Sequence, residues 1–349
     1  MNKPDEGEKM KTETVSQLLA GGHLAFAREP RDNPDNLRFS RYALTPIEHD
    51  YPGKSPAMWN AAYRKFGFDA GYIFLVGEPQ NAQEILGAFQ NDPKYIGGGA
   101  GVGFKDEAVK YIGLDPMAEA IGAINFIMKM PDGSLRGYNT DGLGYAMGLA
   151  ERFTARGDDL YGKKAVMLGA GGTGNAIAFA LAERGMTVTI LNRTVKKAEE
   201  LAARVNRFMG IQLASFGGEE NIPDEILKAD AIINVSTKGS SGEMAEYSAL
   251  APATLPATPE NVNKNLTETR RLLGLVPKKT IVSDVVLTKE PTPFLRVASE
   301  LGFETLDGVP MVVNQGVEAF WLLHGQDLTW NGVKKEDLAA VMKEAASQK

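Results

Sequence analysis

The apolar and polar residues of this chain alternate between short apolar runs and longer amphipathic segments. The apolar runs have the length of buried strands and lie at residues 41–44, 72–76, 165–168 and 187–191. The amphipathic or alanine-rich segments predict helices at residues 57–65, 81–90, 175–184 and 195–208. Strands that alternate with helices are typical of an α/β fold, and we expect a mostly parallel sheet.

Further elements are predicted around these. In the first half, one helix is expected to begin at Lys105, another to cover residues 117–121, and a hairpin to turn at residues 131–133 (Pro-Asp-Gly). A helix after Asp141 would link the two halves. Two C-terminal helices, at residues 312–323 and 335–346, are expected to pack back on the first half.

A glycine-rich turn follows the third of these apolar runs. Residues 164–176 read Lys-Ala-Val-Met-Leu-Gly-Ala-Gly-Gly-Thr-Gly-Asn-Ala, which is a strand, a turn and the start of a helix. The backbone N–H groups of such a turn can bind a pyrophosphate, so we predict a dinucleotide site of the Rossmann type. Its expected cofactor-binding residues are Gly169, Ala170, Gly171, Gly172 and Thr173.

The next strand ends in Asn192, Arg193 and Thr194, which we also assign to cofactor binding. An Asp or Glu at this place would accept hydrogen bonds from a free ribose 2′-hydroxyl, and this chain has none. The guanidinium of Arg193 suits a 2′-phosphate instead. The predicted cofactor is therefore NADP rather than NAD.

Composition limits the classes of protein that fit. The chain has 349 residues, of which 43% are hydrophobic and 23% charged, so two packed domains are expected. Its net charge of −6 argues against a nucleic-acid partner or an anionic membrane surface. Cysteine is absent and the histidines number three, widely spaced, so we expect no disulfide and no metal. Without a signal-like or membrane-spanning apolar run, a cytoplasmic monomer or homodimer is expected.

The expected domain organisation is as follows. Residues 1–38 form an N-terminal extension that we interpret as a surface arm. Residues 39–143 and 312–349 form a substrate-binding domain, and residues 144–311 form the NADP-binding domain. Within the latter, residues 239–279 are rich in Pro, Ala, Thr and Asn and include a possible short helix at 268–273. We interpret them as an insertion that makes a surface excursion rather than a lid.

Proton-transfer chemistry has two candidates. Oxidation of an alcohol releases a hydride and a proton, so the site needs a group that relays the proton. Lys105 and Asp141 would form such a pair if the fold brings them together. Each also has a structural interpretation, Lys105 as a solvated lysine at a helix start and Asp141 as a helix cap.

At these residues the chain resembles the shikimate dehydrogenase family, which includes enzymes acting on quinate. The shared motifs occur in the family's order, at residues 55–60, 104–109, 122–125, 137–141, 169–172, 192–194, 234–236 and 307–315. The resemblance implies NADP-linked interconversion of shikimate and 3-dehydroshikimate, with Lys105 and Asp141 as the catalytic pair. It further implies that Ser55 binds the substrate carboxylate and that Asn125 and Gln315 bind its hydroxyls. Residues 234–237, with Ser236 and Thr237 among them, and Met311 would border the nicotinamide.

The substrate motifs depart from the family pattern at three places. Gly53 stands where the family has a serine, Gly101 where it has a threonine, and Leu287 where it has a tyrosine. Loss of these hydroxyls predicts a larger pocket, which would admit quinate or another cyclic hydroxy acid. Alternatively, Lys54 supplies the missing carboxylate contact and shikimate remains the substrate. A third possibility is an NADP-binding regulatory protein without turnover.

Overall fold

The computed structural model describes residues 13–29 and 32–347, which form two compact units. Unit 1 holds the described residues of Met1–Ala118, Gly122–Tyr138 and Phe320–Lys349. Unit 2 holds Glu119–Ile121 and Asn139–Ala319. Apart from the short stretch Glu119–Ile121, the chain crosses between the units at residues 138/139 and 319/320, whereas the sequence placed the domain boundaries at 143/144 and 311/312.

Unit 1 is built on a seven-stranded sheet in the order β1-β3-β2-β4-β6-β7-β5. Its strands are β1 Leu24–Phe26, β2 Arg41–Ile47, β3 Ala70–Gly77, β4 Tyr95–Gly99, β5 Gly113–Leu114, β6 Phe126–Lys129 and β7 Leu135–Tyr138. Strand β2 runs parallel to β3 and β4, and β5 runs parallel to β7, but the other pairs are antiparallel. The expectation of a mostly parallel sheet is therefore wrong for this unit, because the β6–β7 hairpin and the edge strand β1 add antiparallel pairs.

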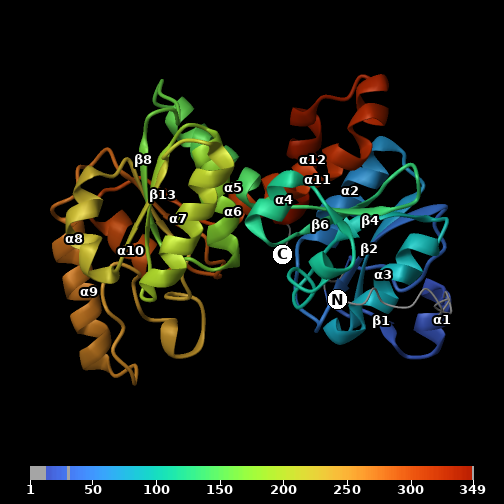
Figure 1. The fold of residues 1–349 in the computed structure, drawn as a ribbon, viewed down its shortest axis with the longest axis horizontal. Helices are drawn as coiled ribbons and strands as arrows, with labels where there is room; N and C mark the ends of the chain where they lie inside the picture. Colours follow the sequence, from blue (N-terminus) through green and yellow to red (C-terminus); the bar gives the residue numbers. More distant parts are fainter. Residues whose placement is uncertain (1–12, 30–31, 348–349) are drawn as a thin grey trace, which may run out of the picture. The chain divides into compact units, whose positions relative to one another are not determined.

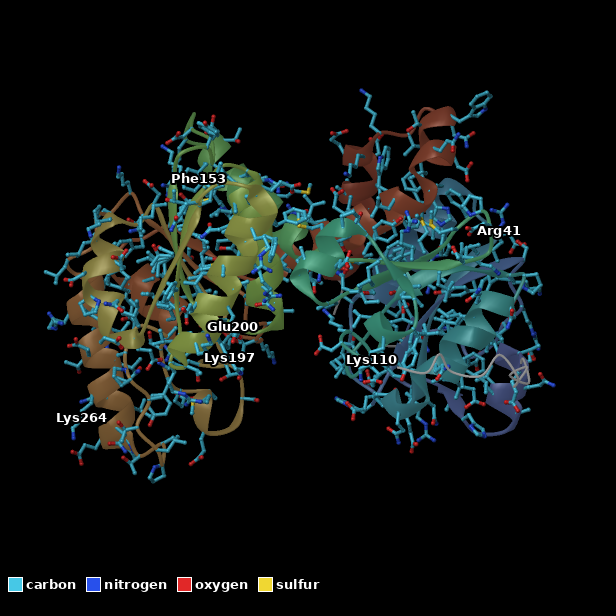
Figure 2. The ribbon with its side chains drawn as sticks, viewed as in Figure 1. Arg41, Lys110, Phe153, Lys197, Glu200 and Lys264 are labelled. Carbon is cyan, nitrogen blue, oxygen red and sulfur yellow. The ribbon has the colours of Figure 1, made fainter. Side chains whose placement is uncertain are left out.

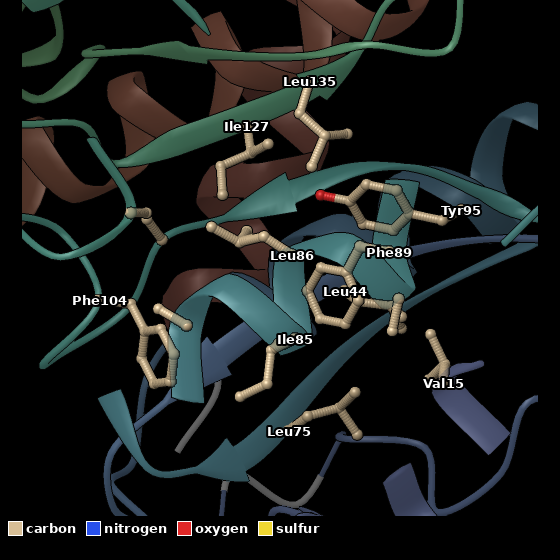
Figure 3. Close-up of a cluster of buried hydrophobic side chains, with 14 of the residues drawn as sticks. Val15, Leu44, Leu75, Ile85, Leu86, Phe89, Tyr95, Phe104, Ile127 and Leu135 are labelled. Carbon is tan, nitrogen blue, oxygen red and sulfur yellow. The ribbon is translucent and has the colours of Figure 1, made fainter. Parts of the chain in front are cut away.

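Helices cover this sheet and close its core. They are α1 Val15–Ala20, α2 Ser55–Phe66, α3 Ala82–Asn91, α12 Lys335–Ser347 and the second half of α11 Val309–Trp330; α4 Pro116–Ile121 is divided between the units. The rings of Trp59 on α2 and Phe320 on α11 have centroids 4.9 Å apart, which confirms that the C-terminal helices pack on the N-terminal unit. Figure 3 shows the core under α3, where Phe89 and Tyr95 stack beside Leu44.

Part of the N-terminal extension belongs to this core. Val15, Leu18 and Leu24 are buried, and β1 pairs antiparallel with β3 from Leu24 opposite Gly77. The interpretation of a surface arm is wrong for residues 14–26, whose apolar side chains are spaced to reach the sheet. Residues 1–12 and 30–31 of the extension lie outside the described residues.

The helix expected from Lys105 is also wrong. Residues 102–107 form turns, followed only by the 3₁₀ helix η2 Ala108–Lys110. Phe104 and Ala108 are buried one turn apart, and the amide of Ala108 donates to the carbonyl of Phe104. Strand β5 already begins at Gly113, so the segment that starts with Phe104 and Ala108 is too short to form a longer helix with a buried face.

Unit 2 contains a six-stranded, fully parallel sheet in the order β10-β9-β8-β11-β12-β13. Its strands are β8 Lys164–Leu168, β9 Thr187–Leu191, β10 Ala214–Gly217, β11 Ala231–Asn234, β12 Ile281–Asp284 and β13 Thr305–Leu306. Its helices are α5 Asp141–Thr154, α6 Gly172–Glu183, α7 Val195–Met209, α8 Ile222–Glu225, α9 Pro259–Leu273, α10 Pro293–Glu300 and the first half of α11, with 3₁₀ turns at Glu219–Asn221, Ile226–Lys228 and Gly242–Met244. Helices α5, α6 and α7 cover one face and α8, α9 and α10 the other (Figure 1). This confirms the doubly wound Rossmann-type domain.

The segment at residues 239–279 is packed rather than a surface excursion, so that interpretation is wrong. Instead of a short helix at 268–273, it holds the 15-residue helix α9, whose N-cap Thr258 accepts a hydrogen bond from the amide of Asn261. Leu272 and Leu273 of α9 are buried in the core of unit 2, and Tyr247 ahead of the helix is fully buried. Within the described ranges, none of the helices combines the length and apolar character needed to cross a bilayer.

Candidate active site

The turn between β8 and α6 has the shape that a phosphate site requires. Gly169 has a φ of +123°, and a Cβ there would lie 3.0 Å from the amide nitrogen of Ser236. A Cβ at Gly171 or Gly172 would meet nothing within 4 Å, so the space in front of the α6 N-terminus is open. The unpaired amides and the positive dipole end of this 12-residue helix favour an anion there.

The end of β9 provides the positive charge beside this turn. Arg193 is exposed, and Nδ2 of Asn192 donates to the carbonyl of Thr194 at 2.9 Å, which shapes the turn into α7. Lys197 lies in the first turn of α7 (Figure 2). It lines the same pocket as Arg193. The sequence analysis missed Lys197, although a lysine three residues into the helix after β9 was a readable signal.

One pocket in unit 2 gathers most of the predicted cofactor residues. Its lining includes Gly169, Ala170, Gly171, Asn192, Arg193, Thr194, Ser236 and Thr237. Gly172 lines the adjoining hollow together with Asn175, Lys197 and Arg204. Thr173 and Met311 line neither of these two spaces, and Met311 lies at the start of α11, where it is nearly buried.

A buried polar network shapes the loop after β11. The side-chain oxygen of Asn234 accepts hydrogen bonds from the amide and the hydroxyl of Ser236, at 2.9 and 2.7 Å. Its Nδ2 donates to Asp284 Oδ1 at 3.0 Å, and Thr292 donates to Asp284 Oδ2 at 2.7 Å. Burial raises the pKa of the Asp284 carboxyl to about 6, although these hydrogen bonds act to lower it.

Asp141 and Gln315 come together in unit 2. Asp141 is the first residue of α5, is mostly buried, and its amide donates to Oδ1 of Asn139 at 3.1 Å. The hydroxyl of Thr140 donates to the carbonyl of Gln315 at 3.0 Å. A Cβ at Gly144 would lie 2.5 Å from the amide nitrogen of Gln315, so α5 and α11 approach closely because residue 144 has no side chain.

Lys105, Asn125 and Ser55 belong to unit 1. The carbonyl of Lys105 accepts a hydrogen bond from the amide of Ile124 at 3.3 Å, which holds Lys105 beside Asn125. Asn125 is mostly buried; its amide donates to the carbonyl of Tyr138, and its own carbonyl accepts from Ala100.

A set of hydroxyls that the sequence analysis did not single out surrounds Ser55. Thr45 donates to the Tyr72 hydroxyl at 2.7 Å and accepts from the amide of Gly99 at 2.8 Å, and Ser55 also hydrogen-bonds Tyr72. Burial raises the pKa of Tyr72 to about 12. Tyr72 lies within a predicted apolar strand and Thr45 directly follows another, so only the fold revealed that their hydroxyls meet.

Comparison with known proteins places the chain in a family. A model described as the shikimate dehydrogenase substrate binding domain matches residues 45–127, and one described as shikimate/quinate 5-dehydrogenase matches residues 149–247. The shikimate dehydrogenase (NADP(+)) of Methanosarcina acetivorans is 34% identical over 300 residues, which cover 85% of this chain and 96% of that protein. The chain belongs to the shikimate dehydrogenase family.

Solved structures agree with this assignment. The shikimate 5-dehydrogenase of Thermus thermophilus, in complex with NADP(H) and shikimate, is 26% identical with a TM-score of 0.60, covering 87% of this chain and 99% of that chain. The shikimate 5-dehydrogenase of Listeria monocytogenes has the same fold, with a TM-score of 0.71 at 24% identity over 88% of this chain and 99% of that one.

Two departures from the family pattern do not open space in unit 1. A Cβ at Gly101 would lie 2.4 Å from Cγ2 of Ile47 and 2.8 Å from the carbonyl oxygen of Pro46. A Cβ at Gly53 would lie 2.7 Å from the ring of Phe74. The expectation that these glycines enlarge a pocket is wrong, because neighbouring atoms already occupy the volume that the family's side chains would fill.

Histidine and metal chemistry have no geometric support among the described residues. In these ranges, no cluster of three or more His, Cys, Asp or Glu side chains has the arrangement to hold a metal ion. His324 is buried in unit 1 against Tyr63, whose hydroxyl lies 3.2 Å from Nε2. Burial, together with the charge of Arg41, lowers the pKa of His324 to about 4, so it packs as a neutral ring.

Proposed function

We propose that this protein is an NADP-linked oxidoreductase that interconverts shikimate and 3-dehydroshikimate. The observation that carries the proposal is the pocket in which the glycine turn after β8 meets Arg193 and Lys197, in a chain of the shikimate dehydrogenase family. Relatives at 32–34% identity carry the name shikimate dehydrogenase (NADP(+)). A quinate enzyme and a regulatory protein without turnover are not favoured.

The residues of unit 2 fit NADP. Gly171 and Gly172 leave the α6 N-terminus open for the pyrophosphate, and Gly169 lets the chain turn beneath it. Arg193 and Lys197 place two positive charges at the end of β9, which suits a ribose 2′-phosphate. Glu219 also lines the pocket, but its carboxylate is paired with Lys238 at 2.9 Å. When bound, NADP supplies the hydride acceptor for the alcohol carbon of the substrate.

We assign proton transfer to Lys105 and Asp141. Oxidation of the shikimate alcohol removes a hydride from carbon and a proton from its hydroxyl, and the Lys105 amine takes that proton. Asp141 orients the hydroxyl and offsets the positive charge that forms on the lysine. The amide of Ile124 donates to the carbonyl of Lys105, and the amide of Asp141 donates to Oδ1 of Asn139; these hydrogen bonds support the assignment, because they fix the chain at both residues.

Substrate binding falls to three further residues. We assign the carboxylate to Ser55, at the first turn of α2, and the ring hydroxyls to Asn125 and Gln315. The burial of Asn125 supports its role, because a hydrogen bond to a buried side chain is stronger than one exposed to water. We further propose that the enzyme is cytoplasmic and works as a monomer or homodimer. Light scattering of the purified protein tests the oligomeric state.

A steady-state assay tests the reaction. Purified protein is supplied with NADP or NAD and with shikimate or quinate, and reduced cofactor is followed by absorbance. We expect turnover of shikimate with NADP. Turnover of quinate alone would favour the quinate alternative, and tight NADP binding without turnover of either acid would favour the regulatory one.

A further inference from the structure

The segment between β11 and α9 reaches the dinucleotide pocket. Met244, Ala249, Ala253 and Leu255 line it, and all four are apolar. Leu255 is 48% exposed, an unusual position for a leucine beside a charged phosphate site. The family-model match ends at residue 247, so Ala253 and Leu255 lie outside the matched residues.

The layout of the pocket indicates which part of a dinucleotide faces these side chains. Gly169 and Gly171 belong to the pyrophosphate end, and Arg193 and Lys197 belong to the phosphorylated ribose. Arg193 follows β9, and Ile222 follows β10, the neighbouring strand at the edge of the sheet. Ile222 also lines the pocket. The chemical group attached to that ribose is the adenine ring, which is flat and has two apolar faces.

We propose that Met244, Ala253 and Leu255 form an apolar wall that binds the adenine ring of the cofactor. The proposal rests on the proposed NADP-linked function and assigns to this segment a role in cofactor affinity. Ile222 lines the same pocket, so the ring has apolar side chains from two segments of the chain. Burial of the ring and of Leu255 against each other removes apolar surface from water.

Hydrogen bonds hold this wall in place. Asn265 of α9 is 2% exposed; its Oδ1 accepts from the amide of Ser248 at 2.8 Å, and its Nδ2 lies 2.9 Å from the carbonyl oxygen of Ala251. The buried Tyr247 donates its hydroxyl to the carbonyl of Thr254. Lys238 donates to the same Ala251 carbonyl at 3.0 Å. The wall is thus ordered before the ligand binds, which lowers the entropy lost on binding.

The test compares a probe that contains adenine with one that lacks it. Adenosine 2′,5′-bisphosphate and reduced nicotinamide mononucleotide are titrated into the full chain by calorimetry or NMR. We expect Leu255→Ser and Met244→Ser each to weaken binding of the adenosine probe about fivefold, and binding of the mononucleotide not at all. Tyr247→Phe, which loosens the wall without touching the ligand, should also weaken only the adenosine probe.

A matched control is Leu275→Ser. Leu275 is 58% exposed and lies after α9, away from the pocket lining, so the variant should bind both probes like wild type. Unchanged affinity for the adenosine probe in both Leu255→Ser and Met244→Ser would contradict the proposed adenine-binding wall. An equal loss of affinity for both probes would contradict it as well. A wild-type protein that binds neither NADP nor the adenosine probe would overturn the proposed function, and the wall with it.

Discussion

The side-chain amide of Asn234 and the carboxylate of Asp284 are joined by a hydrogen bond of 3.0 Å at the ends of β11 and β12. Both residues are fully buried and lie opposite each other in the parallel ladder. Asn234 in turn holds Ser236 in the loop that lines the dinucleotide pocket. The charge state of one buried carboxyl is therefore linked to the shape of the pocket.

Asp284→Asn should change how stability depends on pH. The folded-state pKa of Asp284 is raised to about 6 from 3.8, so its stabilising effect is complete below pH 3.8 and is lost as the pH rises through 6. Between pH 4 and 7, the free energy of unfolding of the variant relative to wild type should gain up to about 3 kcal/mol. Urea denaturation at both pH values measures this gain.

The control is Asp132→Asn, in the β6–β7 hairpin. Hydrogen bonds from Ser134 lower the pKa of this exposed carboxyl. Raising the pH should therefore bring no gain in the free energy of unfolding of Asp132→Asn relative to wild type. A difference between Asp284→Asn and wild type that stays constant from pH 4 to 7 would contradict the linkage.

Arg193→Ala should weaken NADP binding selectively. Loss of a charged hydrogen bond to the 2′-phosphate costs about 1.5–3 kcal/mol, which is roughly 10- to 150-fold in the dissociation constant. NAD binding should hardly change, because NAD lacks that phosphate. Calorimetric titration of both cofactors measures the ratio.

Lys196→Ala is the matched control for Arg193. Lys196 is three residues after Arg193, in the first turn of α7; its side chain is 71% exposed, its Nζ lies 3.5 Å from Glu199, and it does not line the pocket. Both cofactors should bind this variant as they bind wild type. Equal losses of NADP and NAD in Arg193→Ala would mean that Arg193 supports the fold rather than the phosphate.

Lys105→Met should slow turnover and spare the cofactor. The substitution keeps the length of the side chain and removes the group that carries the proton, so kcat should fall about 10²- to 10⁴-fold with NADP affinity intact. Asp141→Asn should also lower kcat, because an amide cannot offset the charge on the lysine. Lys110→Met, which removes an exposed partner of Glu107, should leave kcat unchanged. A rise in KM alone for Lys105→Met would make Lys105 a binding residue only.

Gly101→Ala should destabilise the fold. The added methyl would lie 2.4 Å from Ile47, so the surroundings must shift at a cost of about 1–3 kcal/mol in the free energy of unfolding. Gly87→Ala is the contrast, because a Cβ there meets nothing within 4 Å and removing a helical glycine stabilises by about 0.5–1 kcal/mol. Thermal and urea unfolding compare the two. Similar stability of both variants would show that Gly101 tolerates a side chain.

Local patterns predicted much of this molecule. The strand at Thr187–Leu191, the glycine turn before α6 and the Arg193 position depend on residues close in sequence, and the structure has them where they were expected. The helix predicted from Lys105 was wrong. The residues there have the composition of a helix start, but the structure forms only a single buried turn between Phe104 and Ala108.

By itself, the sequence determined the dinucleotide turn, the parallel nucleotide-binding sheet and the family, because each depends on short ordered motifs. Only the tertiary structure showed that residues 239–279 are packed, that Gly101 faces a filled space, and that Asn265 holds residues 13–17 positions away in sequence. Burial and hydrogen-bond partners of this kind are set by residues distant along the chain. A polar, proline-rich stretch therefore looks like a surface loop until the side chains that cover it are in place.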